Sequence, residues 1–125
     1  MIKETKTDAA PLAIGPYSQG TDNGQIVMVS GQLPIDPKTN KFAGNDIISQ
    51  TRQSLQNVQN ILAAAGLTMA NVMKSTVYLA NMDDFKDMNA VYSEFFQAPF
   101  PARAAFQVAK LPLGALVEIE VLASR

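Results

Sequence analysis

The chain has 125 residues, which suits a single domain and is enough to bury a core without disulfides or a structural metal. Charged residues make up 17% of it, below the ~25% of typical soluble domains, and the net charge of −1 argues against nucleic acid or an anionic membrane as the main partner. It has no cysteine and no histidine, which excludes thiol nucleophiles, Ser-His-Asp and Cys-His catalysis and the usual zinc and iron sites. We therefore expect one domain over residues 1–125 with no metal site.

Two further expectations follow from the composition. Residues 1–15 lack the continuous apolar run of a signal peptide, and no segment approaches the ~20 apolar residues of a membrane span, so we expect a cytoplasmic protein. Because charges are few, we also expect another subunit to cover part of the apolar surface.

The first third of the chain predicts three strands. Residues 2–5 suit a short strand, and Asn23-Gly24 is a dipeptide typical of hairpin turns. Ile26–Val29 is apolar on both faces, as in a central strand, and Gly31 marks a place where the backbone can approach another group closely. Residues 34–41 contain two prolines and predict a turn region.

The first helix is predicted to begin at a cap formed by Asn45 or Asp46 and to end at Ala65, before Gly66. Its apolar positions recur at three- and four-residue spacing: Ile48, Leu55, Val58, Leu62 and Ala65. Its polar, uncharged face consists of Gln53, Gln56, Asn57, Gln59 and Asn60. We interpret that face as solvated, with a contact surface as the alternative.

A strand over Val72–Leu79 and a second helix capped by Asn81 come next. The helix has an aromatic stripe at helical spacing, which predicts core packing: Phe85, Met88, Tyr92, Phe95 and Phe96. Pro99 and Pro101 end it.

Residues 100–121 predict a hairpin of two strands joined by a turn over residues 110–114, which contain Pro and Gly. Side chains alternate between the two faces of a strand, so Arg103, Glu118 and Glu120 would share one otherwise apolar face. The other face, with Ala104, Phe106, Val117 and Ile119, would pack against the helices. The charged face suits either a solvated sheet with a cross-strand ion pair worth ~1 kcal/mol or less, or a site for chemistry.

The resulting order is β-β-β-α-β-α-β-β, which predicts an α+β fold with a mixed sheet and both helices on one face. The opposite face would be left for solvent or for a partner subunit, and the low charge content favours the partner.

Five motifs follow one another along the chain: IGPYSQ (14–19), VSGQLP (29–34), NAVY (89–92), PAR (101–103) and VEI (117–119). Together they span nearly the whole chain, and with them the sequence resembles the RidA/YjgF family. The resemblance implies a chorismate-mutase-like fold, a homotrimer with ligand sites between subunits, and cofactor-free hydrolysis of 2-imino or enamine acids, such as 2-aminoacrylate, 2-iminopropanoate and 2-iminobutanoate, to 2-keto acids and ammonia. Members of the imine-deaminase group often carry Cys where this chain has Ala105. The resemblance assigns that position a backbone contact, so we expect the change to be tolerated.

The chemistry of these residues agrees with that activity. A guanidinium matches a carboxylate with two parallel hydrogen bonds, so Arg103 would anchor the substrate, aided by the backbone N–H of Ala105. Glu118 or Glu120 would orient water or accept its proton; the residues alone leave both open, and the resemblance favours Glu118.

By resemblance, Tyr17, Ser30, Gly31 and Asn89 would line the cleft. Three of these side chains also have a local interpretation. Tyr17 would anchor its own turn, the Ser30 hydroxyl would bond nearby backbone, and Asn89 would face solvent.

The alternative function is a trimer that binds keto acids without turnover, or that has a chaperone-like or regulatory role. Other branches of the family are connected with translation inhibition and RNA cleavage. RNA cleavage suits this chain least, because it is slightly acidic and has no histidine. Glu118 distinguishes imine hydrolysis from binding without turnover, since a protein that only binds carboxylates needs no acidic side chain beside the anion.

Overall fold

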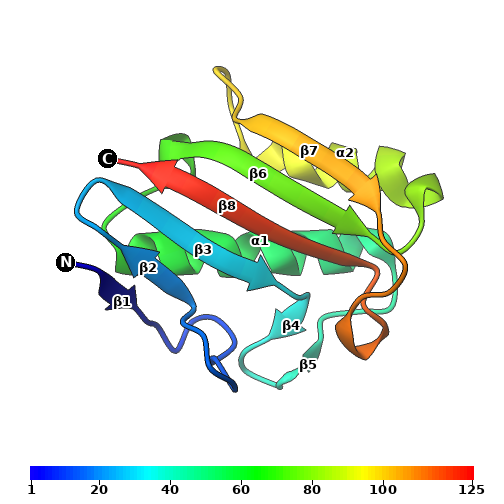
Figure 1. Cartoon of the computed structure of the whole chain (residues 1–125). Coiled ribbons are helices and arrows are strands. Elements are labelled where there is room, and N and C mark those ends of the chain that lie inside the picture. The colour runs from blue at the N-terminus through cyan, green and yellow to red at the C-terminus, as the bar shows by residue number, and fades with distance from the viewer.

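A computed structural model describes all residues 1–125 as a six-stranded sheet with both α-helices on one face (Figure 1). The helices are α1 (Ile47–Ala64) and α2 (Phe85–Phe95). The strands of this sheet are β1 (Lys3–Thr5), β2 (Gly20–Asp22), β3 (Ile26–Gln32), β6 (Val72–Leu79), β7 (Ala102–Gln107) and β8 (Val117–Ser124), in the spatial order β1-β2-β3-β8-β6-β7. Every pair is antiparallel except β6–β7, which is parallel. The predicted mixed α+β fold with two helices on one face is confirmed.

The segment predicted as a turn region contains two further short strands, β4 (Ile35–Asp36) and β5 (Lys41–Phe42), which pair only with each other. Local hydrogen bonding explains them. The Asp36 carboxylate accepts from the Lys38 N–H at 2.9 Å, and Asn40 adopts φ +59, so the chain reverses tightly enough for its ends to pair. Three single 3₁₀ turns complete the fold: η1 (Met69–Asn71), η2 (Met82–Asp84) and η3 (Pro112–Gly114).

Helix α1 begins and ends where the sequence predicts. The Asp46 side chain caps it by accepting from the Ser49 N–H at 2.9 Å, and Gly66 follows it with φ +77. Two assignments of its faces are wrong. Ile48 is exposed, because its neighbour Ile47 takes the buried position, and Asn57 is fully buried.

The buried amides of α1 hold the loops that run beneath it. Asn57 donates to the backbone oxygens of Leu33 and Ile35 at 3.2 and 2.9 Å. Gln50 donates to the Gly44 oxygen at 2.9 Å and accepts from the Leu116 N–H at 2.8 Å. These bonds satisfy backbone groups that neither helix nor sheet can pair, which is why the polar face of α1 is partly inside.

The core lies between the helices and the sheet. The aromatic stripe of α2 packs there as predicted, with Met88, Tyr92 and Phe96 buried. Asn81 caps η2, which runs directly into α2, by accepting from the Asp83 N–H at 2.9 Å. No helix of the chain is both long enough and apolar enough to span a bilayer.

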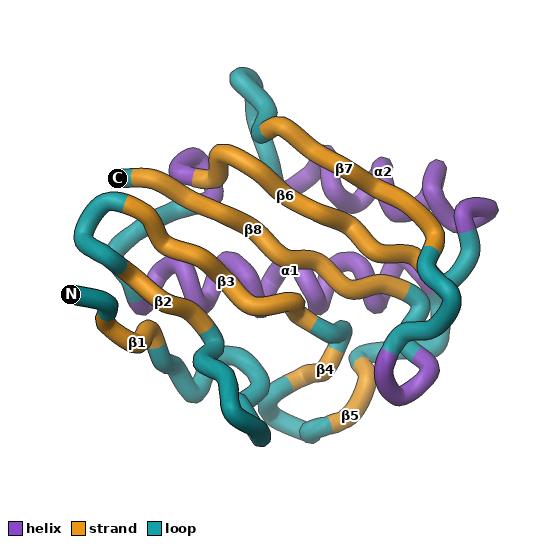
Figure 2. The backbone as a smooth tube through the Cα atoms, in the orientation of Figure 1, coloured by secondary structure: helices purple, strands orange, loops and turns teal.

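The predicted hairpin of residues 100–121 is wrong, because β7 and β8 do not pair. Strand β6 lies between them, and β7 is an edge strand (Figure 2). The cause is the connection through α2, since a strand that follows a crossover helix pairs parallel to the strand before that helix. The connection after β7 crosses the end of β6, so that β8 pairs with β6 on the side opposite to β7.

This pairing also reverses the predicted faces of β7. Directly paired residues share a face, and Arg103 is paired with the buried Ser75, so Arg103 lies on the helix side. Phe106 is paired with Tyr78 on the open face, and their rings meet edge to face at 5.4 Å between centroids. Strand β8 keeps its predicted faces, with Ile119 in the core and Glu118 on the open face.

Candidate functional site

Arg103 is held against α2 by an amide and two aromatic rings. Its Nη1 donates to Oδ1 of Asn89 at 2.6 Å, and its Cζ lies 4.7 Å from the ring centroid of Tyr92 and 5.4 Å from that of Phe85. The Tyr92 ring is itself fixed, because its hydroxyl shares a 2.6 Å hydrogen bond with the buried Ser75. The guanidinium is therefore oriented before any ligand binds.

No acidic side chain pairs with Arg103. The two ion pairs of the chain lie elsewhere, between Arg52 and Glu94 and between Arg125 and Asp22. The interpretation of Arg103 as one half of a cross-strand ion pair is therefore wrong. Its remaining N–H groups have no partner within the chain, which leaves them available to an anion.

A cleft of about 400 Å³ opens beside the guanidinium. It is lined by Asn89, Tyr92, Ser93, Phe100, Pro101 and Arg103. The cleft combines one unpaired cation with aromatic and small polar walls, which suits a small carboxylate. Asn89 lines it and accepts the hydrogen bond from the guanidinium, so its partly exposed side chain has a partner within the chain as well as solvent.

The backbone of β7 adds a donor at the same edge. Peptide groups along a strand point alternately to its two sides, and the Val108 N–H donates to the Leu79 oxygen of β6 at 2.9 Å. The N–H groups of Arg103 and Ala105, which differ from Val108 by an odd number of residues, therefore point away from β6. Ala105 thus presents an N–H at the outer edge of β7, two residues from Arg103, although it is not among the residues that line the cleft. Its contact with a ligand stays a prediction.

Glu118 lies on the open face above a bulge in β3. Between Val29 and Gln32, β3 contains one more residue than the facing stretch of β8, which places Ser30 and Gly31 in the bulge. A Cβ built on Gly31 would overlap the Glu118 carboxylate and lie 3.0 Å from its Cδ. Any other residue at position 31 would therefore displace the Glu118 carboxylate from this position, which is the close approach predicted for Gly31.

The structure distinguishes the two candidate glutamates. Glu120 accepts a hydrogen bond from the Tyr78 hydroxyl, which raises the pKa of Tyr78 to about 12. Glu118 has no hydrogen-bond partner, and burial together with the negative charge of Glu120 raises the pKa of its carboxyl. Glu118 is thus the carboxylate that is free to act on a ligand or a water.

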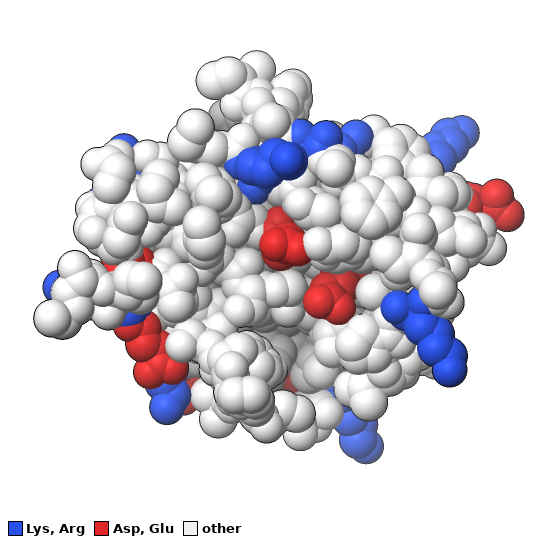
Figure 3. Space-filling model, viewed as in Figure 1, with Lys and Arg blue, Asp and Glu red and all other residues white.

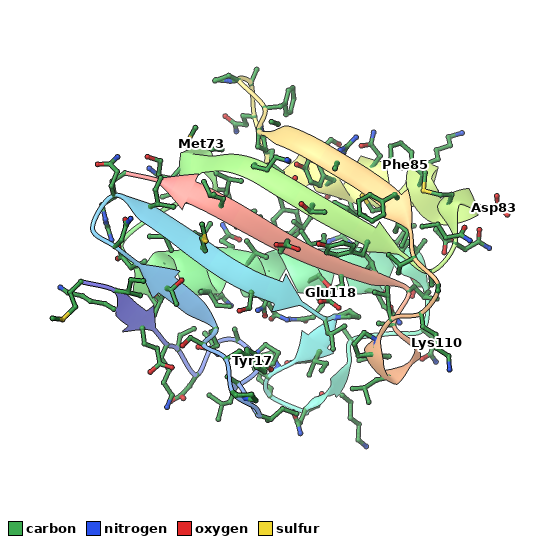
Figure 4. All side chains as sticks on the ribbon, viewed as in Figure 1. Tyr17, Met73, Asp83, Phe85, Lys110 and Glu118 are labelled. Atoms are coloured by element: carbon green, nitrogen blue, oxygen red, sulfur yellow. The ribbon has the colours of Figure 1, made fainter.

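Ser30 and Tyr17 make the local contacts of their alternative interpretations. The Ser30 hydroxyl donates to the Ser18 oxygen at 2.6 Å, and its N–H donates to the Gln19 oxygen at 2.9 Å. The Tyr17 N–H donates to the Gly15 oxygen at 2.8 Å, while its ring is half exposed in the loop before β2 (Figure 4). Neither side chain forms a hydrogen bond with Arg103 or Glu118 in the single chain.

The candidate residues therefore form two groups on opposite faces of the sheet. Arg103, Asn89 and the Ala105 N–H lie at the helix side and outer edge of β7, whereas Glu118 and Gly31 lie on the open face. Figure 3 shows acidic atoms in the middle of the open face, with basic atoms close to part of them and uncharged atoms around the rest, and Figure 4 places Glu118 there. The prediction that Arg103 and Glu118 share a face is wrong. No cluster of acidic side chains is arranged to hold a metal ion.

Sequence reasoning missed three residues of these groups. Phe100 and Ser93 line the cleft, and Tyr78 binds Glu120. Phe100 stands next to the PAR motif, so its position was a usable signal. No signal in the sequence pointed to Tyr78, because its contact with Glu120 depends on the pairing of β6 with β8.

Comparison with known proteins gives one consistent result. The family model described as Endoribonuclease L-PSP matches residues 7–125. The 2-iminobutanoate/2-iminopropanoate deaminase of Salmonella typhimurium is 48% identical over 128 residues, covering 100% of this chain and 99% of that protein. The RutC family protein y4sK of Sinorhizobium fredii is 48% identical over 124 residues, covering 99% and 98%. The crystal structure of Escherichia coli TdcF with bound serine aligns with a TM-score of 0.95 at 44% identity, covering 98% of each chain.

Proposed function

Because the chain belongs to the Endoribonuclease L-PSP family, the RidA/YjgF family, we propose that it hydrolyses 2-imino acids and their enamine tautomers to 2-keto acids and ammonia. The observation that carries the proposal is the oriented guanidinium of Arg103, which has no acidic partner and opens into a cleft of about 400 Å³. The similarity to a protein named for 2-iminobutanoate and 2-iminopropanoate supports the substrate class.

The first step is binding of the substrate carboxylate. The free N–H groups of Arg103 donate two parallel hydrogen bonds to the carboxylate, and the Ala105 N–H adds a third donor. Asn89 holds the guanidinium in the plane that this contact needs. A relative was crystallised with serine, which also carries a carboxylate next to a carbon bonded to nitrogen, and this agrees with the proposed anchor.

The second step is addition of water to the imine carbon. Glu118 accepts a proton as the water oxygen bonds to that carbon and the C=N electron pair moves to nitrogen. Glu118 returns that proton to the nitrogen, which gives the neutral carbinolamine. Glu118 then takes the hydroxyl proton and passes it to the nitrogen, the C–N bond breaks, ammonia leaves, and the C–O bond becomes the keto carbonyl. The oxidation level does not change, so water is the only co-reactant. The protein contributes the positioning of substrate and water and one proton acceptor.

We further propose that the complete site lies between subunits of a homotrimer. The carboxylate carbon and the imine carbon are bonded to each other, so both catalytic groups must lie within reach of one small ligand. Arg103 and Glu118 of one chain lie on opposite faces of the sheet and cannot do this together. A second copy would bring its Glu118 and Gly31, with Tyr17 and Ser30 nearby, to the cleft of the first.

The open face supports this assembly. It exposes large apolar side chains beside the acidic pair, and no helix covers it (Figure 1). These side chains are Met28, Met73 and Phe106, which are 53%, 58% and 44% exposed. Burying such a face against further copies would account for the low charge content of the chain.

The test is ammonia release from 2-iminopropanoate generated by an amino-acid oxidase or a pyridoxal-phosphate enzyme, compared with the spontaneous rate. We expect a clear acceleration that depends on protein concentration. If 2-keto acids bind at the cleft without acceleration of hydrolysis, the non-catalytic binding function replaces this one.

A further inference from the structure

Tyr78 lies on the open face next to both glutamates. It lies on β6 directly opposite Glu118 of β8, and its hydroxyl donates to Oε1 of Glu120, two residues further along the same strand. Its ring is fixed against Phe106 at an interplanar angle of 87°. Tyr78 therefore contacts one acid of the pair while its ring stands beside the other.

We propose that Tyr78 is a positioning residue that holds the Glu120 carboxylate beside Glu118 and so sets the pH range over which Glu118 takes a proton from water. The inference rests on the proposed function for the role of Glu118, but the coupling of the three side chains can be measured without it.

The charged groups around Glu118 influence its proton affinity. The charged or titratable groups on its face are Glu120 on its own strand and Tyr78 and Lys74 on β6, while β3 contributes only the backbone of Gly31. Lys74 is paired with Leu122, on the far side of Glu120 from Glu118. The Arg103 that a second copy would bring to Glu118 in the proposed trimer is unchanged in all the variants. Two carboxylates on one face repel each other, and flexible glutamates relieve that repulsion by turning apart into solvent. The hydroxyl of Tyr78 opposes this movement, because it gives the Glu120 carboxylate a fixed hydrogen bond next to Glu118.

The position of Glu120 affects the proton affinity of Glu118. With Glu120 held in place, its charge acts on Glu118 in addition to burial, and both raise the pKa of Glu118. A general base is most effective when its pKa approaches the working pH, because it then takes a proton more readily. A Glu120 that could turn away would leave Glu118 a weaker base.

A purely structural role of Tyr78 makes a different prediction. If the ring matters only for packing against Phe106, Tyr78→Phe changes nothing, because it keeps the ring and removes only the hydroxyl. This substitution therefore isolates the proposed contact.

The experiment follows the Glu118 carboxyl carbon by ¹³C NMR through a pH titration, in wild type, Tyr78→Phe, Glu120→Gln and the double variant. We expect the Glu118 midpoint to fall by roughly 0.5–1 pH unit in Glu120→Gln, since the repelling charge is gone. In Tyr78→Phe it should fall in the same direction by a smaller amount, and the double variant should match Glu120→Gln. Glu94→Gln, on the exposed face of α2, is the control for a lost charge and should leave the midpoint unchanged.

The pH dependence of kcat for imine hydrolysis is the second readout, and its acid limb should move with the NMR midpoint. An unchanged midpoint in Tyr78→Phe overturns the inference, as does a double variant whose fall is the sum of the two single falls. If wild type does not hydrolyse imines but the midpoints move as expected, the proposed function fails while the Tyr78–Glu120–Glu118 coupling stands. If Tyr78→Phe does not fold, Tyr78 is structural and the inference is overturned.

Discussion

The cleft at β7 and the open face around Glu118 hold charge in opposite ways. The cleft presents a cation without an anion, supported by Asn89 and the Tyr92 ring, and open to solvent. The open face presents two half-buried carboxylates that form no ion pair, and of these only Glu120 has a hydrogen-bond partner. Each region is electrostatically incomplete by itself. The difference agrees with the proposed site between subunits, in which a ligand and a second copy would supply the missing charges.

The largest expected effect comes from the cleft. Arg103→Lys keeps the charge but replaces a planar fork by a point charge on a flexible stem, so the two-pronged carboxylate contact is lost. We expect kcat/KM for imine hydrolysis to fall by ~30- to 1000-fold, which corresponds to ~2–4 kcal/mol of transition-state binding. Melting temperature and oligomer size should stay the same, because Arg103 has no ion pair to lose. Full activity, or a loss that accompanies unfolding, would contradict the anchor role.

The next effect comes from the open face. Glu118→Gln keeps the shape of the side chain and can still bond water, but it cannot accept a proton. Turnover should drop by ~10²-fold or more, while keto-acid binding measured by calorimetry persists. Glu94→Gln serves as the matched control and should retain full turnover. A Glu118→Gln protein with normal turnover would bring Glu120 forward instead.

Mixing the two variants tests whether the halves come from different chains. When Arg103→Lys and Glu118→Gln chains are unfolded and refolded together, a site between subunits finds both native residues in about a quarter of random pairings. We expect the mixture to regain activity well above that of either variant alone, and light scattering to show trimers. A mixture as inactive as its components would place both residues of a site in one chain.

Asn89→Ala should have a moderate effect. It removes the charge-assisted hydrogen bond that orients Arg103, a contact worth ~1.5–3 kcal/mol at most, and leaves the guanidinium itself in place. We expect KM to rise by roughly tenfold, with a smaller change in kcat. A change in kcat alone would show that Asn89 acts on the reacting atoms rather than on the anchor.

The smallest expected effect is on the free energy of unfolding, which ionisation of Glu118 should lower. Burial and Glu120 raise the pKa of Glu118 above its ordinary value of 4.5, so the folded state binds its proton more tightly than the unfolded state. Stability therefore decreases as pH rises above 4.5 through the raised pKa. Glu118→Gln should melt slightly above wild type at about pH 7.5 and show no such gain at about pH 4. An equal or lower melting temperature at the higher pH would show that ionised Glu118 does not oppose folding.

The parts that could be predicted from the sequence are those whose environment is local. Strand β8 alternates apolar and acidic residues, so Ile119 could be placed in the core and Glu118 outside it. Asp46 and Gly66 mark the ends of α1 by capping chemistry that acts over a few residues. Gly31 could likewise be identified as a point where the backbone approaches another group closely. That this group is the Glu118 carboxylate could not be predicted.

The rest depends on pairing between distant segments. Strand β7 has alanine on both of its faces, so its sequence does not specify which face is buried, and a shift of one residue reverses every side chain. Its face was decided by the parallel register with β6, which places Arg103 against α2. The choice between Glu118 and Glu120 likewise depended on Tyr78, which lies some forty residues earlier in the chain.

The buried amides of α1 also have a kinetic consequence for backbone opening. Gln50 binds the Leu116 N–H just before β8, and Asn57 binds Leu33 and Ile35 just after the β3 bulge. The backbone on both sides of Glu118 is therefore attached to one helix rather than to flexible loops. Local opening that frees these groups must disturb α1, so the Leu116 amide should exchange its hydrogen for deuterium as slowly as the amides in the middle of α1, as part of one cooperative unit.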